Sequence, residues 1–225
     1  MNSHFRRETM RVFNPEELFY NSVVVDLETT GLFAGKDQIL QLCAIKPTPR
    51  GPMVFNQYIY AEENPAYHIN RIDPESLKNC PTEREVLQEF WAFVQDRDFI
   101  VSYNAAFEMH FLEERSELHQ LPHGNHAYIC LMETFSAFFF TGWKKLPVAV
   151  RRCLNIKSAK WHDAKSDAYF ALRLFSFFCF LDRPVQLEPI WAPKLWRVKI
   201  TRLKEKPLRK QPAEWSGKDD EELPF

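Results

Sequence analysis

The sequence predicts an α/β domain with a mixed sheet, and three observations lead to this fold class. The chain has 225 residues, and 45% of them are hydrophobic, which is enough for one substantial core. The first half holds three apolar segments joined by short turns, which is typical of an antiparallel meander. After residue 98, strand-like and helix-like segments alternate, which is typical of a sheet covered by helices.

The elements of the first half can be placed in order. The expected strands are VVVD at 23–26, ILQLCAI at 39–45 and VFNQYIY at 54–60. The sequence PRGP at 49–52 is typical of a turn between the last two strands. Pro74 after Asp73 should start a short helix. Thr82 and Glu85 form a capping box before VLQEFWAFV, which predicts a longer one.

The second half begins with FIVS at 99–102, which we expect to be a short buried strand. A helix should begin after Asn104, because asparagine is favoured at N-caps. AYIC at 127–130 should be the next strand. Helices are expected in LMETFSAFFF, LPVAVRRCL and DAKSDAYFALRLFSFFCFL.

Domain boundaries are expected where this pattern starts and stops. We assign residues 1–19 to an N-terminal arm, 20–183 to the compact domain and 184–225 to a partly ordered extension. The net charge is only −1, but the segment from Lys194 to Lys210 has eight Lys or Arg against Glu205. This segment can hold phosphates, or it can be a solvated basic tail without a partner.

The composition argues against several classes of protein. Five cysteines, an odd number with no CxxC or other zinc spacing, are expected to be reduced, buried thiols. The first residues lack the apolar core of a signal peptide, and the most apolar run, FSFFCFL at 175–181, is too short to cross a bilayer. We therefore expect a cytoplasmic protein that does not enter a membrane.

One carboxylate stands in an apolar context. In VSYNAAFEMHFL at 101–112, helical spacing places Glu108 on the same arc as Phe107 and Phe111. Burying a carboxylate is costly unless a partner offsets its desolvation. This segment contains no such partner, so the partner must lie elsewhere in the chain.

Three more carboxylates are expected at the same interior. Asp26 and Glu28 are spaced i and i+2 at the end of an apolar strand, so both can point to one side. Asp167 lies on the apolar face of its predicted helix. Four such charges would repel each other unless cations neutralised them, and an all-oxygen set favours Mg²⁺ or Mn²⁺ in a two-metal site. The alternative is that each carboxylate only caps a helix or pairs with an arginine.

Three segments resemble the motifs of a known enzyme family. VVVDLETTGL, SYNAAFEMHFL and HDAKSDA resemble the three motifs of the DEDDh 3′-5′ exonucleases, the DnaQ-like branch of the ribonuclease H-like fold. The resemblance covers residues 20–181, and INRIDPESL at 69–77 resembles the family's linker between the first two motifs. The pattern is most similar to the proofreading domains of bacterial DNA polymerase III. It implies a five-stranded mixed sheet flanked by helices.

The resemblance also implies catalytic roles. The metal ligands would be Asp26, Glu28 and Asp167, which would bind two Mg²⁺ or Mn²⁺ ions, with Glu108 holding one ion through water. His162 would be the general base, a role that its unperturbed pKa near 6.5 suits at neutral pH. The alternative for His162 is a surface residue before a helix that Asp163 caps.

The loop after the first motif is implied to line the 3′-terminal nucleotide. The nucleic-acid-binding residues implied by the resemblance are Thr29, Thr30, Gly31, Leu32, Asn104 and Phe107. Leu32 would press on the terminal base, and a small apolar contact cannot read base edges, so we expect little sequence preference. Asn104 is explained equally well as an N-cap.

The second motif departs from the family pattern at two positions. Glu108 stands where the family usually has Asp, and Tyr103 stands where His is frequent. The extra methylene of Glu108 moves the carboxylate by about 1 to 1.5 Å, and a displacement of this size can cost about a hundredfold in rate. A slow or metal-selective enzyme is therefore an open alternative.

The resemblance implies a metal-dependent 3′-5′ exonuclease. It would hydrolyse single-stranded or frayed DNA ends to nucleoside 5′-monophosphates, in DNA proofreading or repair. One alternative is an exoribonuclease of the same superfamily, since the site need not exclude a 2′-hydroxyl. Another is a catalytically weak module that binds nucleic acid or a polymerase.

The chain ends in GKDDEELPF, four acids followed by Leu223, Pro224 and Phe225. This end resembles the acidic, Phe-terminated tip of bacterial single-stranded DNA-binding proteins, which implies docking on replication or repair proteins. Two alternatives stay open: the tail folds back on Lys194–Lys210, or it only makes the chain more soluble.

Overall fold

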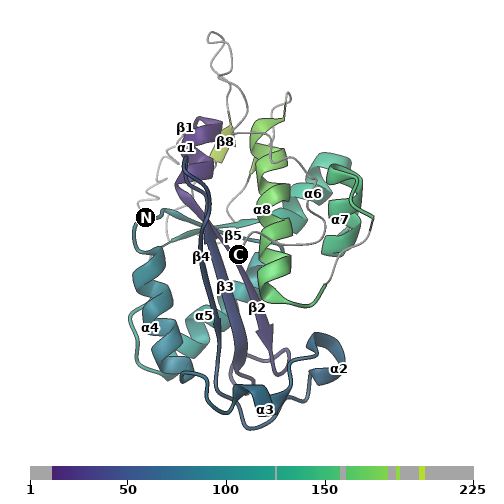
Figure 1. The fold of residues 1–225 in the computed structure, drawn as a ribbon. Helices are drawn as coiled ribbons and strands as arrows, with labels where there is room; N and C mark the ends of the chain where they lie inside the picture. Colours follow the sequence, from purple (N-terminus) through teal and green to yellow (C-terminus); the bar gives the residue numbers. More distant parts are fainter. Residues whose placement is uncertain (1–11, 125, 158–160, 182–185, 188–197, 201–225) are drawn as a thin grey trace, which may run out of the picture.

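The structure is a computed structural model, and it describes residues 12–124, 126–157, 161–181, 186–187 and 198–200 (Figure 1). Its main sheet has five strands in the order β4-β3-β2-β5-β6. The strands are β2 (Ser22–Thr29), β3 (Ile39–Lys46), β4 (Met53–Tyr58), β5 (Phe99–Ser102) and β6 (Ala127–Cys130). β2, β3 and β4 pair antiparallel, whereas β5 is parallel to β2 and β6. The predicted five-stranded mixed sheet is confirmed.

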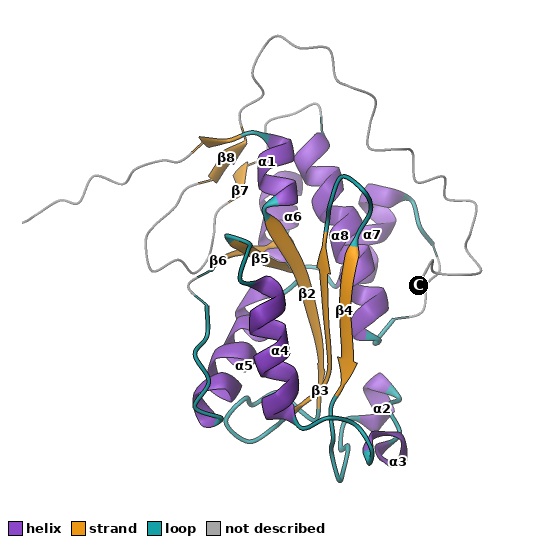
Figure 2. Ribbon diagram, turned by 60° about the vertical axis from the view of Figure 1, so that its left-hand side comes forward, coloured by secondary structure: helices purple, strands orange, loops and turns teal. Residues whose placement is uncertain are grey.

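Helices cover both faces of this sheet. The described helices are α1 (Pro15–Tyr20), α2 (Tyr67–Asn70), α3 (Pro74–Leu77), α4 (Glu83–Val94), α5 (Ala105–Leu118), α6 (Leu131–Phe139), α7 (Leu146–Leu154) and α8 (Ala164–Phe180). Figure 2 shows α4 and α5 on one side of the sheet and α7 and α8 on the other. Each side has its own hydrophobic core, so the domain consists of a sheet between two helical layers.

Strand β2 lies in the middle of the sheet, and all of its residues are buried. Its side chains alternate between the two cores: Val23 and Val25 pack under α4 and α5, whereas Val24 packs under α8. The strand continues to Thr29, beyond the VVVD that sequence predicted, because Glu28 still pairs with Gln41 of β3. The ladder shifts register between Glu28 and Thr29, where the strand opens into a loop.

Local signals explain several helix starts. The capping box at Thr82 and Glu85 is present with both of its hydrogen bonds. Asp73 caps α3 by accepting a hydrogen bond from the backbone of Glu75. Helix α1 begins in the same way, because Asn14 accepts from the backbone of Glu17 at 2.7 Å.

A second, small sheet was not predicted. It has the order β1-β8-β7, formed by Val12–Phe13, Val198–Ile200 and Gln186–Leu187. Strands of two or three residues are too short to show a period of two in the sequence. This sheet pairs residues of the expected N-terminal arm with residues of the expected extension.

Packing begins before residue 20, where we placed the start of the compact domain. Leu18 and Phe19 of α1 are buried, and the Phe19 ring stacks on Phe175 of α8 with centroids 5.6 Å apart. Most of 184–225 lies outside the described residues, and so do the DDEELPF tail and most of Lys194–Lys210. The roles expected for these segments stay predictions.

All five cysteines are free thiols. Cys43, Cys130 and Cys179 are buried, whereas Cys80 and Cys153 are only half-buried, so the expected burial is wrong for these two. Within the described ranges, every helix is too short or too polar to cross a bilayer.

Candidate active site

Two of the four predicted carboxylates come from β2. Asp26 and Glu28 alternate with Val25 and Leu27, so they point to the side of the sheet that α8 covers. Both are buried, with exposed fractions of 8% and 9%. In Figure 1, the carboxyl end of β2 and the amino end of α8 both lie in the lower part of the molecule. The strand thus delivers both carboxylates toward the first turn of α8.

Glu108 lies in the first turn of α5, which follows the end of β5. Its side chain is buried, and Oε2 has no hydrogen-bond partner among the described residues. The pKa of the neighbouring Asp26 is raised well above its usual value, first by burial and then by repulsion from Glu108. The structure therefore places Glu108 beside another buried acid, Asp26, in a cluster that also includes Asp167 and Glu28.

Asp167 lies in the first turn of α8, which Asp163 caps by accepting from the backbone of Lys165 at 3.1 Å. One carboxylate oxygen of Asp167, Oδ2, accepts a hydrogen bond from the backbone of His162 at 3.1 Å. The other oxygen, Oδ1, is buried and has no partner in the described part of the protein. This oxygen is thus available to a ligand.

His162 lies on the loop before α8, with its side chain exposed. Its backbone has a left-handed conformation, with φ 63°. Ligand atoms of Glu28, His162 and Asp167 all lie within 4.8 Å of one another. The imidazole therefore stands at the exposed edge of the carboxylate cluster.

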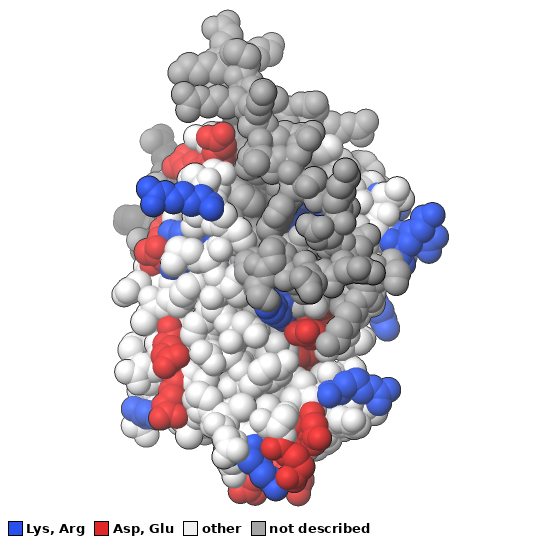
Figure 3. Space-filling view, viewed as in Figure 1, with Lys and Arg blue, Asp and Glu red and all other residues white. Residues whose placement is uncertain are grey.

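The electrostatics of the cluster fit divalent cations. Burial, followed by repulsion from Asp167 and Asp163, raises the pKa of Glu28 to about 8. Burial likewise raises the pKa of Glu108 to about 8 and, with repulsion from Asp163, that of Asp167 to about 6. In Figure 3, acidic side chains reach the surface near the lower end of α8. A set of oxygen donors that resists ionisation and includes two buried oxygens without a described partner is suited to hard divalent ions such as Mg²⁺.

The loop after β2 is held by its own side chains. Asp37 Oδ2 accepts from the backbone of Phe33 at 2.8 Å, and Thr30 Oγ1 accepts from the backbone of Gln38 at 3.1 Å. A Cβ at Gly31 would lie within 2.6 Å of Asp37 Oδ1, Oδ2 and Cγ, so a larger residue here would displace the carboxylate that holds the turn. The loop presents Leu32 and Phe33 to solvent, with exposed fractions of 72% and 70%.

A buried ion pair anchors this loop to the helices. Arg115 of α5 donates to both carboxylate oxygens of Glu83 of α4, at 3.0 Å from Nε. Glu83 also accepts from the backbone of Ile39 at 2.8 Å, and Arg115 donates to the backbone oxygen of Ala34 at 3.3 Å. The pair thus links the loop to the helix that bears Glu108.

The remaining predicted contact residues differ in their surroundings. The side chain of Asn104 makes no capping hydrogen bond, so capping does not account for this residue. Phe107 is half-buried, and its ring packs on Phe111 with centroids 4.8 Å apart. The Thr29 hydroxyl donates to the backbone oxygen of Gly31. The nucleic-acid contacts of these residues stay predictions.

Two supporting residues were missed by the sequence analysis. Gln41 of β3 donates to Asp163 Oδ1 at 3.1 Å and accepts from the backbone of Ala164 at 3.1 Å, which fixes the start of α8. Asn70 donates to the backbone oxygen of Thr29 at 3.2 Å. A glutamine inside the apolar strand ILQLCAI was the available signal for Gln41.

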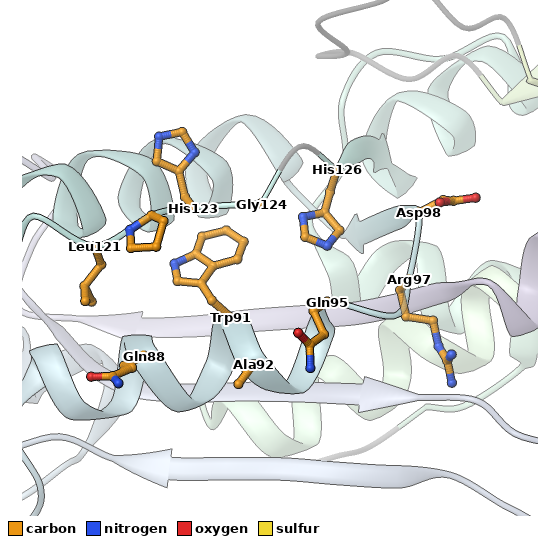
Figure 4. A pocket seen from close by; sticks show the side chains of 11 residues that line it. Gln88, Trp91, Ala92, Gln95, Arg97, Asp98, Leu121, His123, Gly124 and His126 are labelled. Carbon is orange, nitrogen blue, oxygen red and sulfur yellow. The ribbon is translucent and has the colours of Figure 1, made fainter.

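A separate pocket of about 500 Å³ lies between α4 and the chain that leads into β6 (Figure 4). Trp91 lines it, stacked on His126 with centroids 5.8 Å apart, together with His123. None of the predicted site residues lines this pocket, so it is distinct from the carboxylate cluster.

Comparisons with known proteins agree with the resemblance of the three motifs. The exonuclease family model RNase_T matches residues 23–175. The PolC-type DNA polymerase III of Streptococcus mutans is 28% identical over 180 residues, which are 74% of this chain and 12% of that protein. Its counterpart from Halalkalibacterium halodurans is 37% identical over 95 residues, 40% of this chain and 6% of that protein. The chain thus corresponds to a small part of these polymerases.

Solved structures share the fold. A full-length 3′-exonuclease superposes with a TM-score of 0.63 at 14% identity, covering 82% of this chain and 92% of that one. E. coli Exonuclease I in complex with a dA16 oligonucleotide gives 0.58 at 15% identity, covering 70% and 42%. Because the family model spans more than half of the sequence, the chain belongs to the RNase_T exonuclease family, and it shares the fold of these solved exonucleases.

Proposed function

We propose that the protein removes nucleotides from the 3′ ends of single-stranded or frayed DNA, as a proofreading or repair exonuclease. The observation that carries this proposal is a set of carboxylates from β2, α5 and α8 in which ligand atoms of Glu28, Asp167 and His162 lie within 4.8 Å of one another and two carboxylate oxygens have no described partner. The similarity to PolC-type DNA polymerases supports DNA as the substrate and replication as the context. The cytoplasmic location expected from the sequence stays a prediction.

The carboxylates are proposed to hold the metal ions of the reaction. Asp26, Glu28, Asp167 and Glu108 would hold two Mg²⁺ ions. When bound, such ions supply Lewis acidity and offset the charge that develops on the scissile phosphate. Mn²⁺ suits the same oxygen donors.

The residues around the cluster would bind the strand and move the proton. His162 would accept a proton from the attacking water, which its exposed position beside Glu28 and Asp167 permits. The water oxygen forms a new bond to phosphorus as the P–O3′ bond breaks, and the leaving O3′ takes a proton from solvent. The products are a nucleoside 5′-monophosphate and a shortened strand with a 3′-hydroxyl. Leu32 would press on the terminal base, while Thr30 and Gly31 border the sugar. Asn104, which makes no capping bond, would reach the substrate.

An exoribonuclease is the second candidate function. One structure with the same fold is described as a DEDDh family member bound to rAMP, with a TM-score of 0.57 at 14% identity. The fold therefore also occurs in a protein that binds a ribonucleotide. The polymerase relatives favour DNA for this chain.

Incubation of 5′-labelled single-stranded DNA and RNA with Mg²⁺ or Mn²⁺ tests the proposal. The wild type should shorten DNA from its 3′ end, and the ladder should vanish with EDTA or in Asp26→Ala. Glu114→Ala, which removes an exposed acid from α5, is the matched control and should cleave normally. Cleavage of RNA alone would favour the second candidate, and no metal-dependent cleavage of either strand would refute both.

A further inference from the structure

The loop between α6 and α7, residues 140–145, exposes two aromatic side chains. Phe140 has an exposed fraction of 96% and Trp143 of 70%. Phe140 also has a left-handed backbone at the end of α6, with φ 50°, a position that glycine or asparagine usually occupies. A bulky ring is thus present where neither burial nor backbone preference explains it.

The same loop is basic. Lys144 and Lys145 are exposed, and neither has an ion-pair partner within the described ranges. From Thr134 to Lys157 the chain contains no Asp or Glu. The cations in this stretch are Lys144, Lys145, Arg151, Arg152 and Lys157. In Figure 3, basic side chains project from the right-hand edge, over the region of α7.

Tyr103 holds this loop beside the active site. Its buried hydroxyl donates to the backbone oxygen of Lys144 at 2.5 Å. Tyr103 precedes Asn104 directly, and Glu108 follows in the first turn of α5. The backbone oxygen of Tyr103 in turn accepts from Met132 at the start of α6, at 2.9 Å. The departure from the family pattern at Tyr103 thus fixes the position of the loop relative to the second motif.

We propose that residues 140–145 bind single-stranded nucleic acid upstream of the 3′ end that enters the active site. Trp143 and Phe140 would stack on bases, while Lys144 and Lys145 contact phosphates. Proteins that bind single strands combine these two elements, aromatic platforms and a positive surface. The inference rests on the proposed function, and it adds a second site that binds the strand outside the carboxylate cluster.

An exposed aromatic pair could also bind a protein partner. The lysines argue against it, because lysine is depleted in the cores of protein interfaces. The link through Tyr103 argues in the same direction, because it ties the loop to the segment that carries a catalytic carboxylate. Nucleic acid is therefore the occupant that we assign.

Substrates of two lengths distinguish binding at this loop from binding at the active site. We would compare a trinucleotide with a single strand of about 15 nucleotides, a length that can extend past the catalytic cluster. Trp143→Ala should raise KM for the longer strand about tenfold, by the loss of one stacked base, with a much smaller effect on the trinucleotide. Met53→Ala, which truncates an exposed side chain on β4, is the control.

The lysines are tested by salt dependence. In the double variant Lys144→Ala/Lys145→Ala, the slope of log Kd against log salt concentration for the longer strand should become shallower by about 1.4, or 0.7 per lost phosphate contact. Arg50→Ala in the turn before β4 removes an exposed cation elsewhere and should keep the wild-type slope. Binding is measured by fluorescence anisotropy in EDTA, so this test does not depend on cleavage.

The outcomes distinguish the loop from the proposed function. If the wild type binds the longer strand and Trp143→Ala weakens that binding, the loop inference holds even if no cleavage is found, and the proposed function alone fails. If DNA is cleaved but the loop variants match wild type in KM and Kd, the inference is overturned, as expected for a protein-binding surface. An equal effect on both substrate lengths would also overturn it, because it would place the loop within the active site.

Discussion

The backbone N–H of His162 donates a hydrogen bond to Oδ2 of Asp167 at 3.1 Å, which ties the proposed general base to a proposed metal ligand. His162 has a left-handed backbone, which asparagine adopts at less cost than alanine. His162→Asn should therefore keep the turn and remove the base, and kcat should fall by about 10²- to 10⁴-fold. Steady-state hydrolysis of single-stranded DNA measures this change, with His110→Asn on the exposed side of α5 as the control.

A fall in kcat that His110→Asn reproduces would show that the loss is not specific to His162. Unfolding curves of His162→Asn should match those of wild type, since the backbone hydrogen bond to Asp167 does not involve the imidazole.

Glu108 should support a higher kcat than aspartate would at the same position. Its longer side chain already reaches the cluster, because its charge raises the pKa of Asp26 more than any other neighbouring carboxylate does. Glu108→Asp should therefore lower kcat by about ten- to a hundredfold, and Glu108→Gln should lower it at least as much. Glu114→Asp on the same helix is the control for the loss of a methylene. Higher activity in Glu108→Asp would mean that the extra methylene is a handicap.

The stability of the metal-free protein should depend on pH. The pKa values of Glu28 and Glu108 are raised to about 8 in the folded state by burial, so the folded state binds protons more tightly than the unfolded chain does. The free energy of unfolding in EDTA should therefore be highest near pH 4.5 and decrease as the pH rises to about 8, with no further loss from these groups above that.

Excess Mg²⁺ should reverse part of this loss, because the metal binds the deprotonated carboxylates. The stabilisation by Mg²⁺ should therefore grow between about pH 5 and pH 8. Urea unfolding at several pH values, with EDTA or Mg²⁺, measures both effects, and Glu28→Gln should show a flatter profile in EDTA. A metal-free stability that rises over this range would contradict the assigned cause of the pKa shifts.

The ion pair between Glu83 and Arg115 should be essential for stability. Arg115→Met leaves Glu83 buried without its main cation, and this should cost about 3 to 5 kcal/mol in the free energy of unfolding. The double variant Glu83→Gln/Arg115→Met should lose less, because no charge is left behind. Denaturant unfolding compares these variants with Lys78→Met, which breaks an exposed pair with Glu75 and should have no measurable effect.

Phe140 should reduce the stability of the protein. Its left-handed backbone costs an L-residue about 1 to 2 kcal/mol, whereas glycine bears little of this cost. Phe140→Gly should therefore raise the free energy of unfolding by about 1 kcal/mol. Thermal and urea unfolding measure it, and Phe139→Gly, at the preceding helical position, should instead be destabilising.

The strands at 99–102 and 127–130 were predicted with their observed bounds because each is a short, mostly apolar run that follows a polar residue. Helix α1 was missed although Asn14 and Pro15 form a start signal, because only six residues follow and no periodicity can develop. The fold class could be predicted because it depends on the order of strands and helices, and composition and periodicity indicate that order.

Some residues of the site could be predicted from the sequence and others could not. Glu108 was singled out from the sequence because a buried charge conflicts with its apolar neighbours. In the structure, Oε2 of this residue is buried without a hydrogen-bond partner among the described residues. The supporting role of Gln41 could not be predicted, since it depends on contact with Asp163, which lies 122 residues away. The roles of the individual carboxylates and of His162 stay predictions.

The position of β2 at the centre of the sheet predicts the order in which heating should abolish activity and unfold the protein. Asp26 and Glu28 belong to the central strand, whose amides should exchange with solvent only through global unfolding. Asp167 belongs to the first turn of a helix, and helix ends fray at a small fraction of that free energy. Inactivation should therefore precede denaturation, with the carboxylate cluster coming apart at the start of α8 while the sheet remains folded.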